Sequence, residues 1–224
     1  MGATVSFLDR ADAGKRLGAA LMRYRDDEPL ILALPRGGVP VALEVARALD
    51  APLDLLIVRK IGVPQQPELA AGAVVDATTP IVVRNDAVIG MARLSEVEFD
   101  RIKDAEIVEI ERRRRRYLGE RPQPELKGRT VIVVDDGIAT GATMRAALRA
   151  LRLGRPRRLV LATPVAPIDT IEALRDHADE IECLETHAFF GAIGNYYSDF
   201  RQVSDEQVVA ALEAAALPRR SSPA

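Results

Sequence analysis

The sequence contains little of what disulfide-bonded, zinc-thiolate or membrane proteins require. It has one cysteine, Cys183, and no tryptophan among its 224 residues. A single cysteine excludes a disulfide framework and a zinc site built from cysteines. The N-terminal segment has no apolar signal core, and no stretch is long and apolar enough to span a bilayer. We therefore expect a cytoplasmic protein with no membrane contact.

An excess of basic charge is also missing, because the formal net charge is −2. Generic binders of nucleic acid carry a basic excess, so nucleic acid is not an expected partner. The one basic run, residues 112–116, is five arginines. Five successive helical residues point all around the helix, and Glu109 and Glu111 stand four residues before Arg113 and Arg115. This pattern is typical of a solvated, ion-paired helix.

Apolar β-type runs alternate with helical patterns along the chain, which indicates an α/β fold with a central, mainly parallel sheet flanked by helices. We predict one domain over residues 1–217 and a disordered tail at 218–224. The expected strands are 30–34, 53–58, 80–83, 130–134, 158–163 and 180–185, and the expected helices are 11–25, 39–49, about 94–118, 142–153 and 168–176.

Chemistry is concentrated where the strand at 130–134 ends, in "VIVVDDGIATGATM" (131–144). Paired carboxylates at Asp135 and Asp136 suit vicinal ribose hydroxyls or a hydrated Mg²⁺. The small residues that follow let backbone N–H groups approach a ligand, and Thr140 and Thr143 add hydroxyls at a helix N-terminus, which suits a phosphate monoester. The plain alternative is an N-capped turn between a strand and a helix.

This stretch resembles the 5-phosphoribosyl 1-pyrophosphate (PRPP) signature of type I phosphoribosyltransferases, above all the "DDxxATGGT" form of the adenine enzyme. The resemblance implies the type I phosphoribosyltransferase fold, with a small hood over the site. It implies that Asp135 and Asp136 hold the ribose hydroxyls and Mg²⁺. The residues that would wrap the 5-phosphate are Ala139, Thr140, Gly141, Ala142 and Thr143.

A second loop, "LPRGGVP" (34–40), follows the first strand. Paired glycines permit backbone conformations closed to other residues, and Arg36 offers a forked anion donor. The loop resembles the pyrophosphate loop of the family, in which the peptide before the first glycine is often cis. We therefore expect Arg36 and Gly37 to bind pyrophosphate and the Arg36–Gly37 peptide to be cis. Taken alone, the motif could also be an ordinary glycine turn.

A third segment, "VRKIGVPQQPELAAG" (58–72), places Arg59 and Lys60 at the end of an apolar strand. It is similar to the basic pair and mobile loop of the adenine and orotate enzymes, which close over the site and exclude water. The resemblance implies that Arg59 binds substrate and that Lys60 acts beside the two aspartates. By itself, an Arg–Lys pair at a strand end is more often a solvated edge.

The hood is expected at residues 186–204, with a possible contribution from the N-terminus. This part of the chain holds five of the nine aromatic residues. It resembles the hood of hypoxanthine-guanine phosphoribosyltransferase, which implies base contact by Phe189 and Phe190 and pyrophosphate contact by Arg201. Asn195 falls where the oxopurine enzymes carry a metal-binding aspartate. A hydrophobic oligomer contact is the alternative interpretation of this segment.

The function implied is transfer of ribose 5-phosphate from PRPP to a nucleobase-like or amine acceptor, by a homodimer that uses Mg²⁺. Ala139 occupies the place of an acidic base residue of the oxopurine enzymes, and Pro167 falls at the place of their base-reading lysine. The alternative function is a regulator that binds PRPP or a nucleotide without catalysis. A dinucleotide binder is disfavoured because no G-x-G-x-x-G follows the first strand.

Overall fold

A computed structural model describes residues 5–77 and 79–216, so the tail predicted at 218–224 lies outside the described residues. Five parallel strands form the main sheet in the order β2-β1-β6-β7-β8. This confirms the predicted α/β fold with a central parallel sheet. The strands are β1 (Leu30–Ala33), β2 (Leu53–Leu55), β6 (Thr130–Val134), β7 (Arg158–Pro167) and β8 (Glu180–His187).

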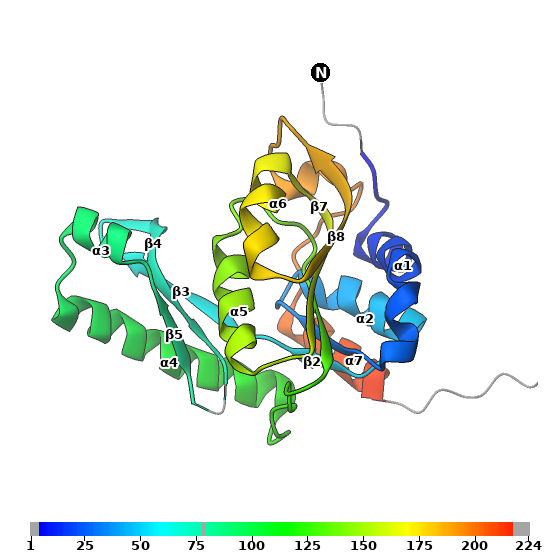
Figure 1. Cartoon of the computed structure of the whole chain (residues 1–224), viewed down its shortest axis with the longest axis horizontal. Helices are drawn as coiled ribbons and strands as arrows, with labels where there is room; N and C mark the ends of the chain where they lie inside the picture. The colour runs from blue at the N-terminus through cyan, green and yellow to red at the C-terminus, as the bar shows by residue number, and fades with distance from the viewer. Residues whose placement is uncertain (1–4, 78, 217–224) are drawn as a thin grey trace, which may run out of the picture.

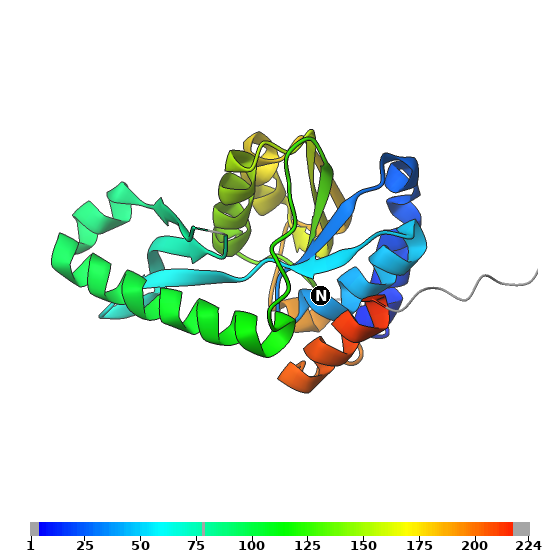
Figure 2. The ribbon, with the colours of Figure 1, turned by 90° about the horizontal axis from the view of Figure 1, so that it is seen from below.

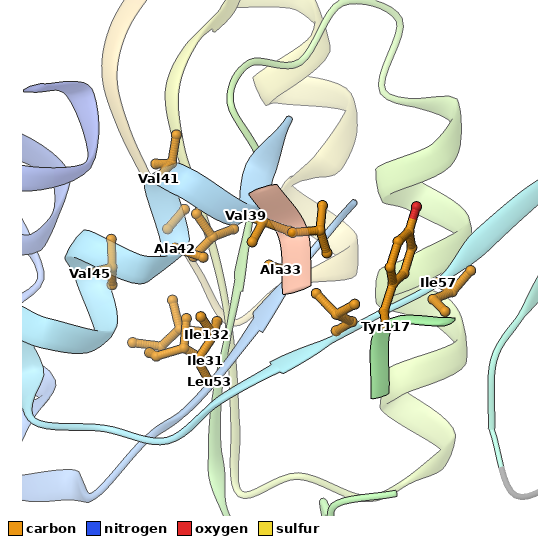
Figure 3. Close-up of a cluster of buried hydrophobic side chains, with 14 of the residues drawn as sticks. Ile31, Ala33, Val39, Val41, Ala42, Val45, Leu53, Ile57, Tyr117 and Ile132 are labelled. Atoms are coloured by element: carbon orange, nitrogen blue, oxygen red, sulfur yellow. The ribbon is translucent and has the colours of Figure 1, made fainter. Parts of the chain in front are cut away.

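Helices cover both faces of this sheet (Figure 1). One face carries α1 (Arg10–Ala20), η1 (Met22–Asp27), α2 (Gly38–Leu49) and α7 (Asp205–Ala216). The other carries α5 (Ala142–Leu153), α6 (Ile168–Leu174) and η2 (Arg175–His177). Because side chains alternate along a strand, Ile31 and Ile132 pack with Val45 of α2 (Figure 3), whereas Leu32 and Val133 pack on the α5 side.

A second sheet of three antiparallel strands projects to one side of α5 (Figures 1 and 2). It consists of β3 (Val58–Val63), β4 (Gln66–Val75) and β5 (Ile81–Arg84), followed by α3 (Asp86–Ala92) and the 23-residue α4 (Glu96–Leu118). The predicted strand 53–58 is therefore wrong in extent, because the chain leaves the main sheet after Leu55. The segment 58–72, likened to a mobile loop, forms most of a β3–β4 hairpin with its turn at Pro64 and Gln65, and movement of this hairpin stays a prediction.

The hood is built from two ends of the chain. The segment after β8 contains η3 (Ile193–Tyr196), and Phe7 forms a parallel bridge with Tyr197. The amides of Ser6 and Phe7 both donate to the Tyr196 carbonyl, at 3.0 and 2.9 Å. The N-terminus is therefore hydrogen-bonded to the segment predicted as the hood, and its role as a cover over the site stays a prediction. No helix within residues 5–77 and 79–216 is long and apolar enough to cross a membrane.

Candidate active site at the carboxyl ends of β1 and β6

Asp135 and Asp136 follow β6 directly, and Asp135 is partly buried whereas Asp136 is buried. Asp136 is 7% exposed, and its amide donates to Asp135 Oδ1 at 2.9 Å. Burial raises the pKa of Asp135 well above its usual value, and the charge of Asp136 raises it further. Burial also raises the pKa of Asp136, against the opposing effect of Arg10. Two acids with raised pKa values at a strand end are a candidate functional site.

Arg10, the first residue of α1, completes the acid pair and was not anticipated from the sequence. Its Nε donates to Asp136 Oδ2 at 2.7 Å, with both side chains nearly buried. One terminal nitrogen donates to the Arg201 carbonyl at 2.8 Å, and the guanidinium lies 3.9 Å from the Phe200 ring centre. Arg10 thereby joins the hood to the acids. Nothing local distinguishes it from other arginines of a charged helix, so only the tertiary fold reveals it.

The glycine loop lies against these acids. The cis peptide is Pro35–Arg36, so the expectation of a cis bond at Arg36–Gly37 is wrong by one residue. Gly37 already has helical dihedral angles, φ −60° and ψ −39°, as the N-cap of α2. A Cβ at Gly37 would overlap the Asp136 carboxyl, and one at Gly38 would lie 2.9 Å from Asp135 Cα. Glycine at 37 leaves room for the Asp136 carboxyl, and glycine at 38 allows the close approach of the backbone at Val134 and Asp135.

The predicted phosphate loop leads into α5, which begins at Ala142 as expected. Gly137 and Ile138 are buried, and a Cβ at Gly137 would overlap Ile193 of the hood. Gly141 then takes φ +71°, a left-handed conformation that favours glycine. The outer face of the loop is exposed, so hydroxyls and first-turn N–H groups are accessible to an anion. The exposed residues are Ala139, Thr140, Ala142 and Thr143.

Arg36 and Arg201 each form an ion pair with an aspartate outside the acid pair. The Arg36 guanidinium is 3.5 Å from Asp205 Oδ1, and Arg201 pairs with Asp199 at 2.5 Å with its side chain 89% exposed. A cavity of about 430 Å³ adjoins Arg201 and the first turn of α2. Its lining includes Arg10, Pro40, Arg201, Gln202 and Gln207. Arg201 therefore lines the same cavity as the first turn of α2, the helix that follows the glycine loop.

Arg59 and Lys60 lie in the second sheet, away from this cavity. Both line a separate groove of about 430 Å³ between the hairpin and α4, together with Arg101 and Glu106. Arg59 Nε donates to Glu106 at 2.6 Å. The structure does not bring the basic pair together with Arg36 and Arg201. Action of Lys60 at the acid pair stays a prediction that requires movement of the hairpin.

The aromatic residues of the hood divide into a packed group and an exposed one. Phe190 stacks on Tyr196 with ring centres 5.0 Å apart, and Tyr196 lies 4.5 Å from His187. Tyr197 donates through its hydroxyl to the Asp136 carbonyl at 2.5 Å. Phe189 is 97% exposed. Its contact with a base, like that of Phe190, stays a prediction.

The arginine run at 112–116 is ion-paired, as its pattern predicted, and Cys183 lies half-buried in β8. Burial raises the pKa of the half-buried Cys183 thiol to about 12, so the reactive thiolate is disfavoured. In the arginine run, Arg112 and Arg113 both pair with Glu109, whose pKa falls to about 2 as a result. Arg114 pairs with Asp76 of the second sheet.

The donor set at the acid pair fits Mg²⁺ rather than a tightly caged metal. Within the described part of the chain, no group of three or more His, Cys, Asp or Glu side chains could hold an ion. Mg²⁺ is commonly held by one or two carboxylates together with waters and substrate phosphates. Asp135 and Asp136 supply such carboxylates beside the predicted phosphate loop.

Comparisons with known proteins agree with this geometry. The family model described as "Phosphoribosyl transferase domain" matches residues 8–201. Two Mycobacterium tuberculosis sequences, each named "Putative phosphoribosyl transferase", are 44% identical over 209 residues, which is 93% of this chain and 47% of theirs. The chain thus spans about half the length of these relatives. The crystal structure of TT1426 from Thermus thermophilus is 41% identical, with TM-score 0.82, covering 94% of this chain and 99% of that one.

A more distant structure shares the fold over nearly the whole chain. It is a hypothetical protein from Neisseria gonorrhoeae with bound ppGpp, which has a TM-score of 0.52 at 14% identity. The match covers 96% of this chain and 98% of the other. At this identity the likeness concerns the fold alone.

Proposed function

Because the chain belongs to the phosphoribosyl transferase domain family, we propose that it transfers ribose 5-phosphate from PRPP to a nucleobase-like or amine acceptor. Pyrophosphate is the second product. An aminopurine acceptor would place the protein in nucleotide metabolism, in purine salvage. The family and the α/β fold support a transferase, and the acceptor and the homodimeric state are parts of the proposal.

One observation carries the proposal: three ligand-binding elements meet at one edge of the sheet. The acid pair ends β6, the glycine loop between β1 and α2 lies against it, and the N-terminus of α5 follows it within six residues. Ligands of open α/β sheets bind beyond the carboxyl ends of the strands. A sugar, a pyrophosphate and a phosphate monoester are the three parts of PRPP, and each has a matching element.

In the proposed reaction the bond between ribose C1 and the pyrophosphate oxygen breaks, and a bond forms between C1 and a nitrogen of the acceptor, which then loses a proton. Asp135 and Asp136 accept hydrogen bonds from the ribose hydroxyls and balance positive charge developing on the sugar. Arg10 keeps the Asp136 carboxylate in place. Asp135 and Asp136 would hold Mg²⁺, which would supply charge neutralisation for the leaving pyrophosphate. The hood, together with the hairpin once it has moved toward the acid pair, excludes water.

A thermal-shift measurement tests the proposal. PRPP with Mg²⁺ should raise the melting temperature, because a ligand that binds only the folded state stabilises it. The double variant Asp135→Asn, Asp136→Asn should remain folded and lose the shift. Asp100→Asn with Asp104→Asn is the matched control, since both acids are exposed on α4. An undiminished shift in the first variant would falsify the assignment of the acids.

A non-catalytic regulator is the second candidate, and two observations favour it. The Neisseria protein of the same fold was crystallised with ppGpp. In addition, Arg36 and Arg201 pair with Asp205 and Asp199, and Lys60 lies in another groove. If the protein is an enzyme, pyrophosphate should compete with PRPP for binding, and it should bind more weakly to the Arg36→Ala or Lys60→Ala variant. The enzyme should also release pyrophosphate when it is given PRPP, Mg²⁺ and a suitable nucleobase or amine. Binding of PRPP without release for every acceptor tried would favour the regulator.

A further inference from the structure

A second cavity, outside the acid pair, lies between α5 and the three-stranded sheet. Its volume is about 250 Å³, and small side chains make its floor, including Ala70, Gly72 and Ala146. Figure 1 shows the two elements that form its walls, the helix α5 and the sheet β3–β5 beside it. Ala142 lines one end, so the cavity begins where the predicted phosphate loop enters α5.

Two arginines of α5 give this cavity its charge. Arg145 and Arg149 stand four residues apart and therefore lie on one side of the helix, where both line the cavity. Within the part of the chain that the structure describes, neither side chain pairs with a carboxylate. Arg84 also lines the cavity, but Glu96 and Asp86 already hold it. The uncompensated positive charge comes from Arg145 and Arg149.

This arrangement is unfavourable for the helix by itself. Like charges four residues apart repel, and Arg145 stands in the first turn, near the positive end of the helix dipole. The first turn of α5 contains no acidic residue to compensate. The positive charges also affect His177. Its pKa is lowered mainly by burial and additionally by the charges of Arg145 and Arg149. An anion between the two guanidinium groups would remove each of these costs.

We propose that the cavity between α5 and the β4–β5 edge is a second anion site, which binds a phosphate monoester group through Arg145 and Arg149. Two guanidinium charges match a phosphate dianion, and each planar fork can donate two hydrogen bonds to its oxygens. The volume admits a phosphate, and the open side allows an attached sugar or nucleoside to extend into solvent. The ligand is either inorganic phosphate or the phosphate of a nucleotide. The site does not depend on the proposed reaction.

Calorimetric titration with inorganic phosphate, AMP and adenosine, without Mg²⁺, tests the site. In the wild type, phosphate and AMP should bind and adenosine should not. Arg145→Gln with Arg149→Gln should weaken this binding roughly tenfold or more, because charge-assisted hydrogen bonds are lost. Thr140→Val with Thr143→Val alters only the predicted 5-phosphate loop. This variant should retain the phosphate binding at Arg145 and Arg149 that the arginine variant loses. AMP tighter than phosphate would identify a nucleotide, and equal affinities would identify the phosphate alone.

The matched control is Arg152→Gln with Arg175→Gln, which removes the same number of positive charges from exposed ion pairs nearby. It should leave the isotherms unchanged. Equal loss in the control would show a general charge effect and overturn the proposal. Identical isotherms for the wild type and the Arg145/Arg149 variant would also overturn it, as would complete loss of binding in the Thr140/Thr143 variant.

Discussion

At the scale of single residues, Asp135 holds a charge that the fold alone does not favour. Its folded-state pKa is raised by burial and by Asp136, so the folded protein binds this proton more tightly than the unfolded chain does. The contribution to stability is therefore present below the unfolded pKa and is lost as pH rises through the folded pKa. A neutral side chain at this position should remove that loss.

We predict that Asp135→Asn raises the free energy of unfolding at pH 7, without ligand, by on the order of 1 kcal/mol. The gain should vanish below about pH 4, where the wild-type carboxyl is protonated in both states. Urea titrations of both proteins between pH 3 and 8 would measure it. A difference that does not change with pH would contradict the prediction. The variant should at the same time lose stabilisation by PRPP and Mg²⁺.

Arg10 is the residue on which the charge of Asp136 depends. Because the pair is nearly buried, Arg10→Ala leaves a carboxylate without its partner and should cost about 3 kcal/mol of unfolding free energy. Arg10→Lys keeps the charge and should recover part of the loss. Removing both charges with Arg10→Ala, Asp136→Asn should cost less than the two single changes together.

Arg201→Gln is the control for this cycle, because that pair is exposed and should leave unfolding unchanged. Additive single-variant costs would show that Arg10 and Asp136 do not interact as the structure indicates.

At the scale of elements, the glycine loop and the acid loop position each other. We predict that Gly37→Ala pushes the Asp136 carboxyl out of place and weakens PRPP binding at least tenfold, because the added Cβ overlaps that carboxyl.

Gly90→Ala in α3 is the control, since a Cβ there meets no atom of the described chain within 4 Å. It should leave binding intact and stabilise slightly, by up to about 1 kcal/mol. Titration of both variants with PRPP and Mg²⁺ distinguishes these outcomes, and unchanged affinity in Gly37→Ala would refute the close approach of the two loops.

At the scale of the whole molecule, we expect residues at the ends of β6 and β7 to select the acceptor. Pro167 closes β7 and has neither a side-chain donor nor an N–H, and Ala139 supplies no acid for a purine ring nitrogen. An oxopurine carbonyl left unpaired would cost about 1–3 kcal/mol, roughly ten- to a hundredfold in discrimination. We therefore predict that hypoxanthine and guanine are poor acceptors beside an aminopurine or an amine. Steady-state rates of pyrophosphate release would show this, and efficient turnover of hypoxanthine or guanine above all other acceptors would refute it.

Local sequence patterns predicted the strands of the central sheet and the candidate binding loops at its edge, although the strand expected at 80–83 lies in the second sheet. The continuous apolar run at 130–134 forms a buried strand, and α5 begins at Ala142, both as their patterns predicted. The acid pair and the glycine loop were recognisable as candidates because the residues of each motif are adjacent in the chain. What the sequence did not show was that the segment 58–72, which contains proline, glutamine and glycine, forms a β-hairpin of a second sheet.

Only the tertiary structure could decide relations between distant residues. The ion pair of Arg10 with Asp136 spans 126 positions, and the cavity between α5 and β4 exists only because a second sheet folds beside the helix. The close approach of Gly37 to the Asp136 carboxyl likewise joins two loops that are far apart in the chain. Local patterns report propensity and burial, whereas partners far apart in the chain are fixed by packing, which a short stretch of sequence does not encode.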